Sequence, residues 1–454
     1  MFIQRKFKGR NFDEISIEES EIIVLTGWVM VMVLSTIPVM ILGKLNFSQS
    51  FFETVSAWTT TGLSVVDVEK APKLLLFWRS LMQLAGGAGL AIIMVSALIG
   101  TSGTGMSISE GRQEQLVPQV KRSAALVLRI YLGITLLGVF AYLFFGMDLF
   151  DAVNHSFAAV STGGFSTKSQ SIGFWNSPQI EATSMIIMFL GNLNFVTTWL
   201  FLRGKFDAFY KNGEVRLFFI LTVIAAFAIA AFTTVHLYSG LGKALRVAVF
   251  ETVSALTTTG FSTVPYTDWN ATGIFVMILL MIVGGGSCST AGGIKQIRVW
   301  ILLQQIRVEL KRLFLPSRAV VEVEIQQGEN LQVYTDKSFR SLCVFMGLYL
   351  MTFGAGTLVL IMNGIPTHHA MFEFASSLGT VGLSIGVTSP GMSMSILWVE
   401  VLGMIMGRLE FFVVIVAISR ILIDFQAYIA NAFSERNRKL TELKATYRKK
   451  AGIG

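Results

Sequence analysis

Eight long apolar stretches alternate with polar segments along the chain. A helix of about 20 apolar residues crosses the hydrocarbon core of a bilayer, so each stretch predicts a membrane-spanning helix. After each odd-numbered stretch comes a further apolar segment of about a dozen residues, too short to cross, which we interpret as a re-entrant helix. The pattern predicts an all-α membrane protein with eight spans and four re-entrant pore helices. The spans are expected at 21–43, 73–100, 123–146, 180–202, 216–238, 271–303, 339–363 and 394–422.

One short phrase recurs four times, each time after an odd-numbered stretch. It reads FFETVSAWTTTGLS at 51–64, VNHSFAAVSTGGFST at 153–167, VFETVSALTTTGFST at 249–263 and MFEFASSLGTVGLS at 371–384. Such repetition indicates four copies of one helix–pore-loop–helix unit. We divide the chain into a leader (1–20), repeat 1 (21–100), repeat 2 (123–202), repeat 3 (216–303), a connector (304–338), repeat 4 (339–422) and a basic tail (423–454).

The repeated phrase carries a threonine two residues before a glycine. Glycine permits backbone angles that turn successive carbonyl groups to the same side. Four such loops around one axis would form rings of carbonyl oxygens, which replace the water shell of an ion in potassium channels. We therefore predict a selectivity filter that binds potassium, made of Thr60, Thr61, Gly62, Thr162, Gly163, Gly164, Thr258, Thr259, Gly260, Thr380, Val381 and Gly382. The alternative is a set of packing loops in a duplicated bundle, since glycine and threonine are common at helix contacts in membranes.

An acidic residue lies nine positions before the glycine in three of the four copies. These residues are Glu53, Glu251 and Glu373, and repeat 2 has His155 instead. We expect each glutamate at the start of its re-entrant helix, where the helix dipole favours negative charge.

These motifs resemble the Trk/Ktr/HKT superfamily of potassium transporters, in particular its TrkH/KtrB-type membrane subunits. The resemblance implies four repeats in pseudo-fourfold arrangement, a potassium substrate and a homodimer. It also implies a cytoplasmic RCK-type regulatory subunit that binds the nucleotide, so that no cofactor is expected in this chain. A serine in place of the first filter glycine accompanies sodium preference in plant relatives, whereas this chain has Gly62. The subgroup stays open, because the number of leading spans is similar to KtrB and the phrase GNLNF at 191–195 is similar to TrkH.

The sixth apolar stretch is interrupted by glycine and hydroxyl residues. A helix is disfavoured there, because each glycine costs about 1 kcal/mol relative to alanine. Irregular backbone at membrane depth must be buried in protein or line a cavity. We interpret the segment as a movable gate below the filter, with a static kink as the alternative. A serine elbow or phosphate loop is excluded, because G-x-S-x-G and G-K-[ST] are both missing. The gate would comprise Gly284, Gly285, Gly286, Ser287, Cys288, Ser289, Thr290, Ala291, Gly292 and Gly293.

Arg408 lies inside the eighth apolar stretch, and an ionisable residue at that depth is a candidate functional residue. The superfamily has a basic residue at a corresponding place, which implies that Arg408 belongs to the gate. Its charge would repel cations in the pore, or it would pair with Glu410 or with carbonyl groups of the glycine-rich segment. A snorkelling or purely structural arginine is the alternative. Asn192 and Asn194 are expected to form hydrogen bonds across helices.

Composition supports a membrane location. Hydrophobic residues make up 53% of the chain and charged residues 14%, whereas soluble domains carry about 25% charged residues. Lysine and arginine gather after the second, fourth and sixth spans and in the tail, which predicts both termini in the cytoplasm and a multi-pass protein of the cell (inner) membrane. The net charge of +8 fits contact with anionic lipid and needs no nucleic acid. No histidine has metal-ligand spacing, so no structural metal is expected.

The connector contains VVEVEI, which alternates like a strand, and QGEN, which suits a turn. It would be a docking element or a solvated segment. The sequence therefore predicts an ion-conducting subunit for potassium uptake and no enzyme. The rival interpretation is a secondary transporter of another cation or solute, for example sodium, although such proteins often have inverted repeats and these repeats keep one topology.

Overall fold

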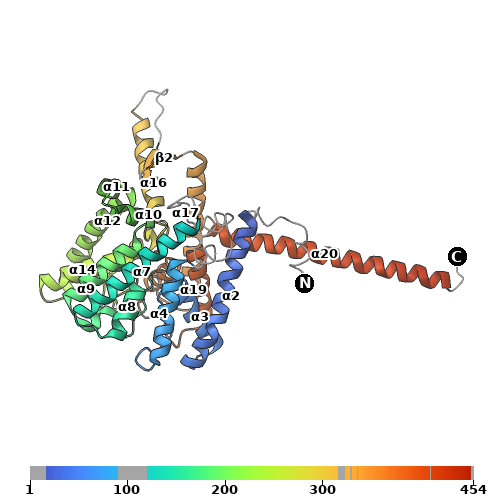
Figure 1. The fold of residues 1–454 in the computed structure, drawn as a ribbon, viewed down its shortest axis with the longest axis horizontal. Coiled ribbons are helices and arrows are strands. Elements are labelled where there is room, and N and C mark those ends of the chain that lie inside the picture. Colours follow the sequence, from blue (N-terminus) through green and yellow to red (C-terminus); the bar gives the residue numbers. More distant parts are fainter. Residues whose placement is uncertain are drawn as a thin grey trace.

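A computed structural model of the chain describes residues 17–89, 120–314, 323–327, 330–334, 336–409 and 411–450. Within these ranges the protein is a bundle of helices, from which α20 (Phe411–Lys450) projects far to one side (Figure 1). The predicted helical architecture is confirmed for the bundle. It is incomplete at one place, where a two-stranded hairpin follows α16. The leader up to residue 16 and residues 90–100 of repeat 1 lie outside the described residues.

The four predicted repeats share an order of elements: a first helix, a short helix ending at the repeated phrase, and a further helix. Repeat 1 contains α2 (Ile17–Gly43), α3 (Phe47–Trp58) and α4 (Lys73–Ala88); repeat 2 contains α7 (Val120–Phe144), α8 (Leu149–Val160), η2 (Ser171–Trp175), α9 (Pro178–Asn192) and α10 (Phe195–Leu202). Repeat 3 contains α12 (Gly213–Ile229), the π-helical turn η3 (Ala230–Thr234), α13 (Val235–Leu237), α14 (Leu241–Leu256), α15 (Ala271–Val283) and α16 (Gln296–Arg312). Repeat 4 contains α17 (Asp336–Met362), α18 (Thr367–Leu378) and α19 (Met394–Leu409).

Local sequence explains where the short helices begin. Asn46 precedes α3, and its side chain accepts a hydrogen bond from the backbone N–H of Gln49 while the Gln49 side chain accepts one from the backbone N–H of Asn46. This capping box satisfies two backbone donors that a helix leaves unpaired at its start. Asp148 caps α8 through the backbone N–H of Asp151.

Five of the described helices are long and apolar enough to cross a membrane. They are Glu21–Gly43, Ala125–Phe144, Gly213–Leu237, Ser338–Met362 and Phe411–Leu440. The pair α9 and α10 makes a sixth if it counts as one span. The other predicted spans contain the shorter helices α4, α15 and α19, so the expected total of eight spans stays a prediction.

Two predicted spans are not continuous helices. The chain bends by 112° between α9 and α10, and irregular backbone separates α15 from α16, as the glycines there predict. In the eighth expected span, α19 is described up to Leu409 and α20 from Phe411, and Arg408 lies in the last described turn of α19. Hydropathy did not reveal the bend between α9 and α10, because Asn192 and Asn194 are too few to interrupt the apolar stretch.

The connector differs from its predicted limits. Helix α16 continues to Arg312, beyond the expected end of repeat 3 at residue 303. The antiparallel strands β1 (Val323–Gln327) and β2 (Asn330–Tyr334) follow, where the alternating sequence predicts a strand. Strand β1 contacts both α16 and α12, which places the hairpin beside the third repeat. Helix α20 continues through the predicted basic tail up to Lys450.

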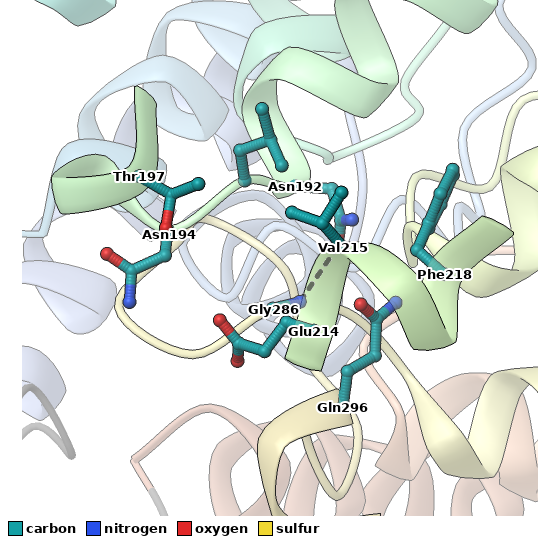
Figure 2. Close-up of a pocket in the computed structure, with 9 residues that line it drawn as sticks. Asn192, Asn194, Thr197, Glu214, Val215, Phe218, Gly286 and Gln296 are labelled. Carbon is teal, nitrogen blue, oxygen red and sulfur yellow. Dashed lines mark hydrogen bonds between the residues drawn. The ribbon is translucent and has the colours of Figure 1, made fainter. Parts of the chain in front are cut away.

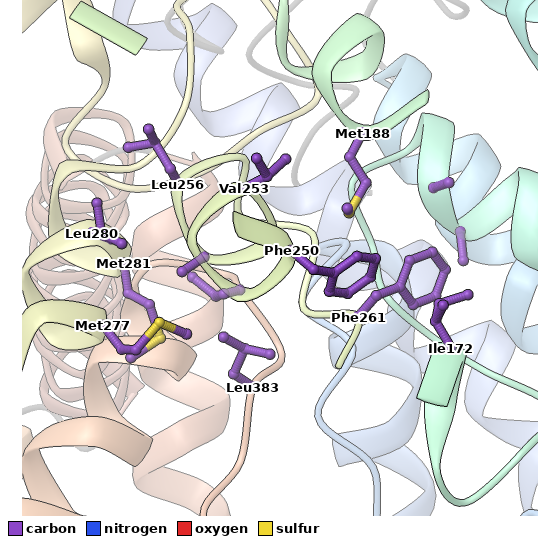
Figure 3. Packing of buried hydrophobic residues seen from close by; sticks show 14 of the residues in the cluster. Ile172, Met188, Phe250, Val253, Leu256, Phe261, Met277, Leu280, Met281 and Leu383 are labelled. Carbon is purple, nitrogen blue, oxygen red and sulfur yellow. The ribbon is translucent and has the colours of Figure 1, made fainter. Parts of the chain in front are cut away.

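The largest apolar cluster surrounds the short helix of repeat 3. Phe250 and Phe261 pack beside Ile172 and Met188 of repeat 2, and Leu256 lies near Met281 of α15 (Figure 3). Such side chains stabilise a membrane bundle through van der Waals packing, because lipid tails are as apolar as the side chains themselves. The cluster holds the repeated phrase of repeat 3 against its neighbours.

Candidate functional site

All four short helices end in the same backbone turn. After α3, the N–H of Thr60 donates to the carbonyl of Ala57 (3.1 Å) and the N–H of Thr61 donates to the carbonyl of Ser56 (2.8 Å). These are the two bonds of a Schellman cap. The same pair recurs after α8, α14 and α18, with Thr162 and Gly163, Thr258 and Thr259, and Thr380 and Val381 as donors.

A threonine occupies the left-handed position of each cap, which glycine usually takes. The φ angles are 55° at Thr60, 50° at Thr162, 53° at Thr258 and 51° at Thr380. A β-branched residue at positive φ is a real outlier that costs about 1–3 kcal/mol and persists only where its surroundings enforce it. Its recurrence in all four repeats indicates a shared constraint on this turn.

The four glycines of the repeated phrase come together in a closed ring. Each has a positive φ, from 70° at Gly164 to 94° at Gly62 and Gly382. A Cβ atom added to any of them would collide with a backbone carbonyl oxygen of the next repeat. Gly62 meets Gly163, Gly164 meets Thr259, Gly260 meets Val381, and Gly382 meets Thr61. The contacts pass from repeat 1 through repeats 2, 3 and 4 and return to repeat 1, so the four loops form one closed circuit of contacts.

The residue nine positions before each glycine holds the chain that follows the glycine. Glu53 accepts hydrogen bonds from the Ser64 hydroxyl (2.9 Å) and the Val65 N–H (3.0 Å). The equivalent bonds join His155 to Ser166, Glu251 to Thr263, and Glu373 to Ser384 and Ile385. The predicted place of these residues at the helix start is wrong, because Glu53 is the seventh residue of α3. Hydrogen bonds to the extended segment that follows the glycine, rather than the helix dipole, stabilise these buried groups.

Three of the further helices carry a glycine against the end of a short helix. A Cβ atom at Gly86, Gly191 or Gly407 would collide with or crowd the carbonyl oxygen of Trp58, Val160 or Leu378, respectively. Each of these carbonyls belongs to the last residue of its short helix. Sequence reasoning missed these glycines, although a glycine within an apolar helix is a signal of close helix contact.

The glycine-rich segment 284–293 lies directly against the filter threonines. The hydroxyl of Thr162 donates to that of Thr290 (3.0 Å), and the backbone N–H of Gly292 donates to the Thr258 hydroxyl (2.7 Å). A Cβ atom at Gly292 would collide with the Thr380 hydroxyl. Among the described residues, the hydroxyl oxygens of Thr60 and Thr380 have no hydrogen-bond partner. The predicted gate residues therefore meet one end of the predicted filter.

Polar side chains of neighbouring helices hold the other side of this segment. Asn192 accepts from the N–H of Gly286 (2.9 Å), and Glu214 at the start of α12 accepts from the N–H of Ser287 (2.6 Å). Both acceptors line a small pocket with Asn194 and Gln296 (Figure 2). The Asn194 amide also reaches Ser287, so Asn192 and Asn194 bond to the irregular glycine-rich segment rather than to another helix as predicted. The sequence analysis missed Glu214, although an acid beside an apolar stretch is a recognisable signal.

Arg408 bridges two repeats and the glycine-rich segment. Its guanidinium donates to the carbonyl oxygen of Thr290 (2.6 Å) and to that of Gly86 (2.8 Å). Of the alternatives, the contact with carbonyl groups of the broken segment is the one present, and Glu410 lies outside the described residues. A charge-assisted hydrogen bond is stronger than a neutral one, so Arg408 stabilises the observed position of Thr290.

Comparison with known proteins fits this geometry. The family described as TrkH, cation transport protein, matches residues 4–424. The chain belongs to the TrkH family. Membership confirms a transport protein rather than an enzyme.

Individual TrkH relatives are similar over nearly their whole length. The Trk system potassium uptake protein TrkH of Escherichia coli K12 is 29% identical over 432 residues, which cover 91% of this chain and 86% of that protein. The Trk system potassium uptake protein TrkI of Halomonas elongata is 31% identical over 430 residues, with coverage of 89% and 84%. The crystal structure of the potassium transporter TrkH from Vibrio parahaemolyticus matches with a TM-score of 0.78 and 28% identity, over 90% of this chain and 86% of that one.

Proposed function

We propose that this TrkH-family protein takes up potassium across the cell (inner) membrane through a pore formed by its four repeats. The ring of glycines and carbonyl oxygens that closes across the four repeats carries this proposal. The curated relatives named as potassium uptake proteins support the choice of ion.

The filter would act through backbone oxygens. Left-handed threonines and glycines alternate with ordinary residues, which keeps successive carbonyls from pointing to opposite sides. Oxygens held in this way replace the water shell of a potassium ion. The two hydroxyls without partners, on Thr60 and Thr380, would offer further oxygen ligands at the end nearest the gate.

The glycine-rich segment would be the gate, and Arg408 would hold it closed. The bonds of Thr290 and Gly292 to filter threonines leave the segment across the ion path. Its glycines lower the steric cost of moving away. Deleting residues 285–289 should therefore raise ion flux without loss of selectivity, and unchanged or lost flux in a folded variant would contradict gating.

Several features of the proposal come from family resemblance. These are a homodimer in the lipid membrane with both termini in the cytoplasm, and an RCK-type partner that binds the regulating nucleotide. The hairpin β1–β2 is the proposed docking element, since it contacts α12 and α16, whose first residues adjoin the gate segment. Cross-linking of the partner to Gln326 or Tyr334 in membranes would test this assignment.

Growth rescue of a potassium-uptake-deficient bacterium tests the function. Rubidium uptake should persist as sodium is raised, whereas a sodium transporter would lose rubidium uptake under competition. Gly260→Ser should weaken potassium selectivity, because its side chain would collide with the Val381 carbonyl. Gly347→Ser is the control, since a Cβ atom there meets nothing within 4 Å. An unaltered ion profile in Gly260→Ser would contradict the filter assignment.

A further inference from the structure

Repeat 4 buries two carboxylic acids and supplies no cation for them. Glu373 in α18 and Glu400 in α19 are both fully buried. The sequence contains no lysine or arginine between Ser341 and Gly407. An isolated ionised carboxylate in an apolar interior is so unfavourable that it must be paired or neutralised.

If both carboxyl groups are ionised, the hydrogen bonds around Thr388 lack one proton, because the Thr388 hydroxyl supplies a single hydrogen for two acceptors. The Thr388 hydroxyl oxygen lies 2.5 Å from Glu373 Oε1 and 3.0 Å from Glu400 Oε2. A hydroxyl has one hydrogen and donates it to one acceptor. For both contacts to be attractive, one carboxyl group must itself be protonated and donate to Thr388.

The other contacts decide which group holds this proton. Glu373 accepts from the hydroxyl of Ser384 (2.6 Å) and from the backbone N–H groups of Ile385 (3.1 Å) and Thr388 (2.9 Å). Such donors stabilise the charged form of a carboxylate. In contrast, Glu400 Oε1 is buried without a hydrogen-bond partner among the described residues. We propose that Glu400 is a proton-binding site, and that its bound proton keeps the Ser384–Thr388 segment after the fourth filter loop in place.

Repeat 1 shows how the fold treats a carboxylate that stays charged. Its equivalent of Glu373 is Glu53, and the Arg79 guanidinium lies 2.6 Å from the Glu53 carboxylate. Glu400 occupies the place of this arginine in repeat 4, seven residues before the glycine that meets the end of the short helix. A protonated Glu400 is neutral, so repeat 4 has a hydrogen-bond donor to Thr388 where repeat 1 has a cation, and the Glu373 carboxylate is stabilised by its own donors.

No other charge takes over this role among the described residues. Helix α19 packs against α18, α3, α17 and α20. Glu373 is the charged neighbour that acts on Glu400 electrostatically. Glu53 on α3 is paired with Arg79, while Arg408 at the other end of α19 donates to carbonyl groups. The other charged or titratable residues on these helices are His368 and His369 on α18, Asp336, Lys337, Arg340, Cys343 and Tyr349 on α17, and those from Arg420 onward on α20.

The step itself is a simple acid dissociation. The Glu400 O–H bond breaks, the electron pair stays on the carboxylate, and the proton passes to bulk water. Two adjacent carboxylates then repel each other and compete for the Thr388 hydrogen. The segment after Gly382 loses this support, so ion uptake is expected to fall as pH rises.

Infrared difference spectroscopy tests the proton directly. The purified full-length protein is titrated from about pH 6 to about pH 9, a range in which an ordinary exposed glutamate stays ionised. We expect the carbonyl-stretch band of a protonated carboxylic acid in the wild type to contain a component that Glu400→Gln lacks. Glu69→Gln, which changes an exposed glutamate bonded to Ser169, is the control that should keep this component. A band of equal size in Glu400→Gln and the wild type, or a wild type without the band, would overturn the proposal.

Rubidium uptake in proteoliposomes gives a second readout, which rests on the proposed uptake function, whereas the infrared band does not. Wild-type uptake should fall several-fold towards alkaline pH. Glu400→Gln carries a neutral amide in place of the acid and should show no fall. A pH profile of Glu400→Gln that is identical to the wild-type profile would overturn the proposal. So would a dependence of uptake on sodium, at constant pH, that the wild type shows and Glu400→Gln lacks, because Glu400 would then bind sodium rather than a proton. Uptake missing at every pH in both proteins would contradict the uptake function and leave the infrared result to decide on the proton.

Discussion

Arg79 in α4 and Glu400 in α19 occupy equivalent positions in repeats 1 and 4. Each lies seven residues before a glycine, Gly86 or Gly407, that meets the last carbonyl of the short helix. Arg79 pairs with Glu53, whereas Glu400 shares the Thr388 hydroxyl with Glu373. The repeats thus keep one backbone arrangement and place a cationic side chain beside it in repeat 1 and an acidic one in repeat 4.

Replacing Arg79 by methionine should strongly destabilise the fold. The pair with Glu53 is almost completely buried, with side-chain exposures of 2% and 0%. Removing one partner of a buried ion pair leaves an uncompensated charge and costs about 3–5 kcal/mol. Thermal unfolding in detergent would measure the loss. Lys70→Met is the control, because the pair of Lys70 with Asp67 is exposed to solvent and contributes little to stability. Equal midpoints for the two variants would contradict the assigned role of Arg79.

Replacing Arg408 by alanine should raise maximal uptake. The variant loses the hydrogen bonds to Thr290 and Gly86, each worth about 1.5–3 kcal/mol for a charged donor. Loss of either would shift a closed gate toward open by about tenfold or more. Rubidium flux into proteoliposomes measures the effect, and Arg408→Lys should give an intermediate value. A fall in uptake with normal thermal stability would favour a purely structural arginine.

Thr290→Val should loosen the gate segment without changing its size. The substitution removes hydroxyl contacts with Thr162 (3.0 Å) and with the Gly191 carbonyl (2.9 Å). Each neutral hydrogen bond contributes about 1 kcal/mol, which corresponds to about fivefold in the gating equilibrium. Single-channel or flux recordings should show more open time. Thr290→Ser keeps the hydroxyl and should shift the equilibrium less; an equal shift in both variants would argue against the bonds.

Gly292→Ala should prevent the gate segment from returning to its observed place. The added methyl group would collide with the Thr380 hydroxyl and the Gly379 carbonyl. We expect constitutively high flux with retained potassium selectivity. Gly354→Ala provides the comparison, since a Cβ atom there meets nothing within 4 Å. Wild-type flux in Gly292→Ala would show that the segment tolerates this contact and would count against a closed position beneath Thr380.

The sequence predicted the features that depend on residue type at a fixed spacing. The four glycines could be aligned because close approach to a neighbouring carbonyl requires the absence of Cβ, and Gly260 meets Val381 in this way. The left-handed threonines were missed, because threonine has no intrinsic preference for that conformation and only the surrounding loops enforce it at Thr60.

Features that depend on partners distant in sequence could not be predicted. At the bend before α10, the Asn192 side chain accepts from the N–H of Gly286, and the N–H of Phe195 donates to the carbonyl of Cys288. Gly286 and Cys288 belong to a segment more than 90 residues further along the chain. The contact of Arg408 with Thr290 spans 118 residues in the chain. Glu214 and Glu400 could have been recognised in the sequence as acids within apolar surroundings. Their partners, Ser287 and Thr388, could not have been predicted from the sequence.

The closed ring of glycines has an evolutionary consequence, because one polypeptide supplies all of it. In an assembly of identical subunits, any mutation appears in every quarter of the pore at once. Here a mutation alters one quarter, and His155 or Val381 shows that individual quarters have diverged without losing the shared geometry. Evolution can therefore change the residues of one repeat to alter gating while the residues of the other repeats continue to recognise the ion.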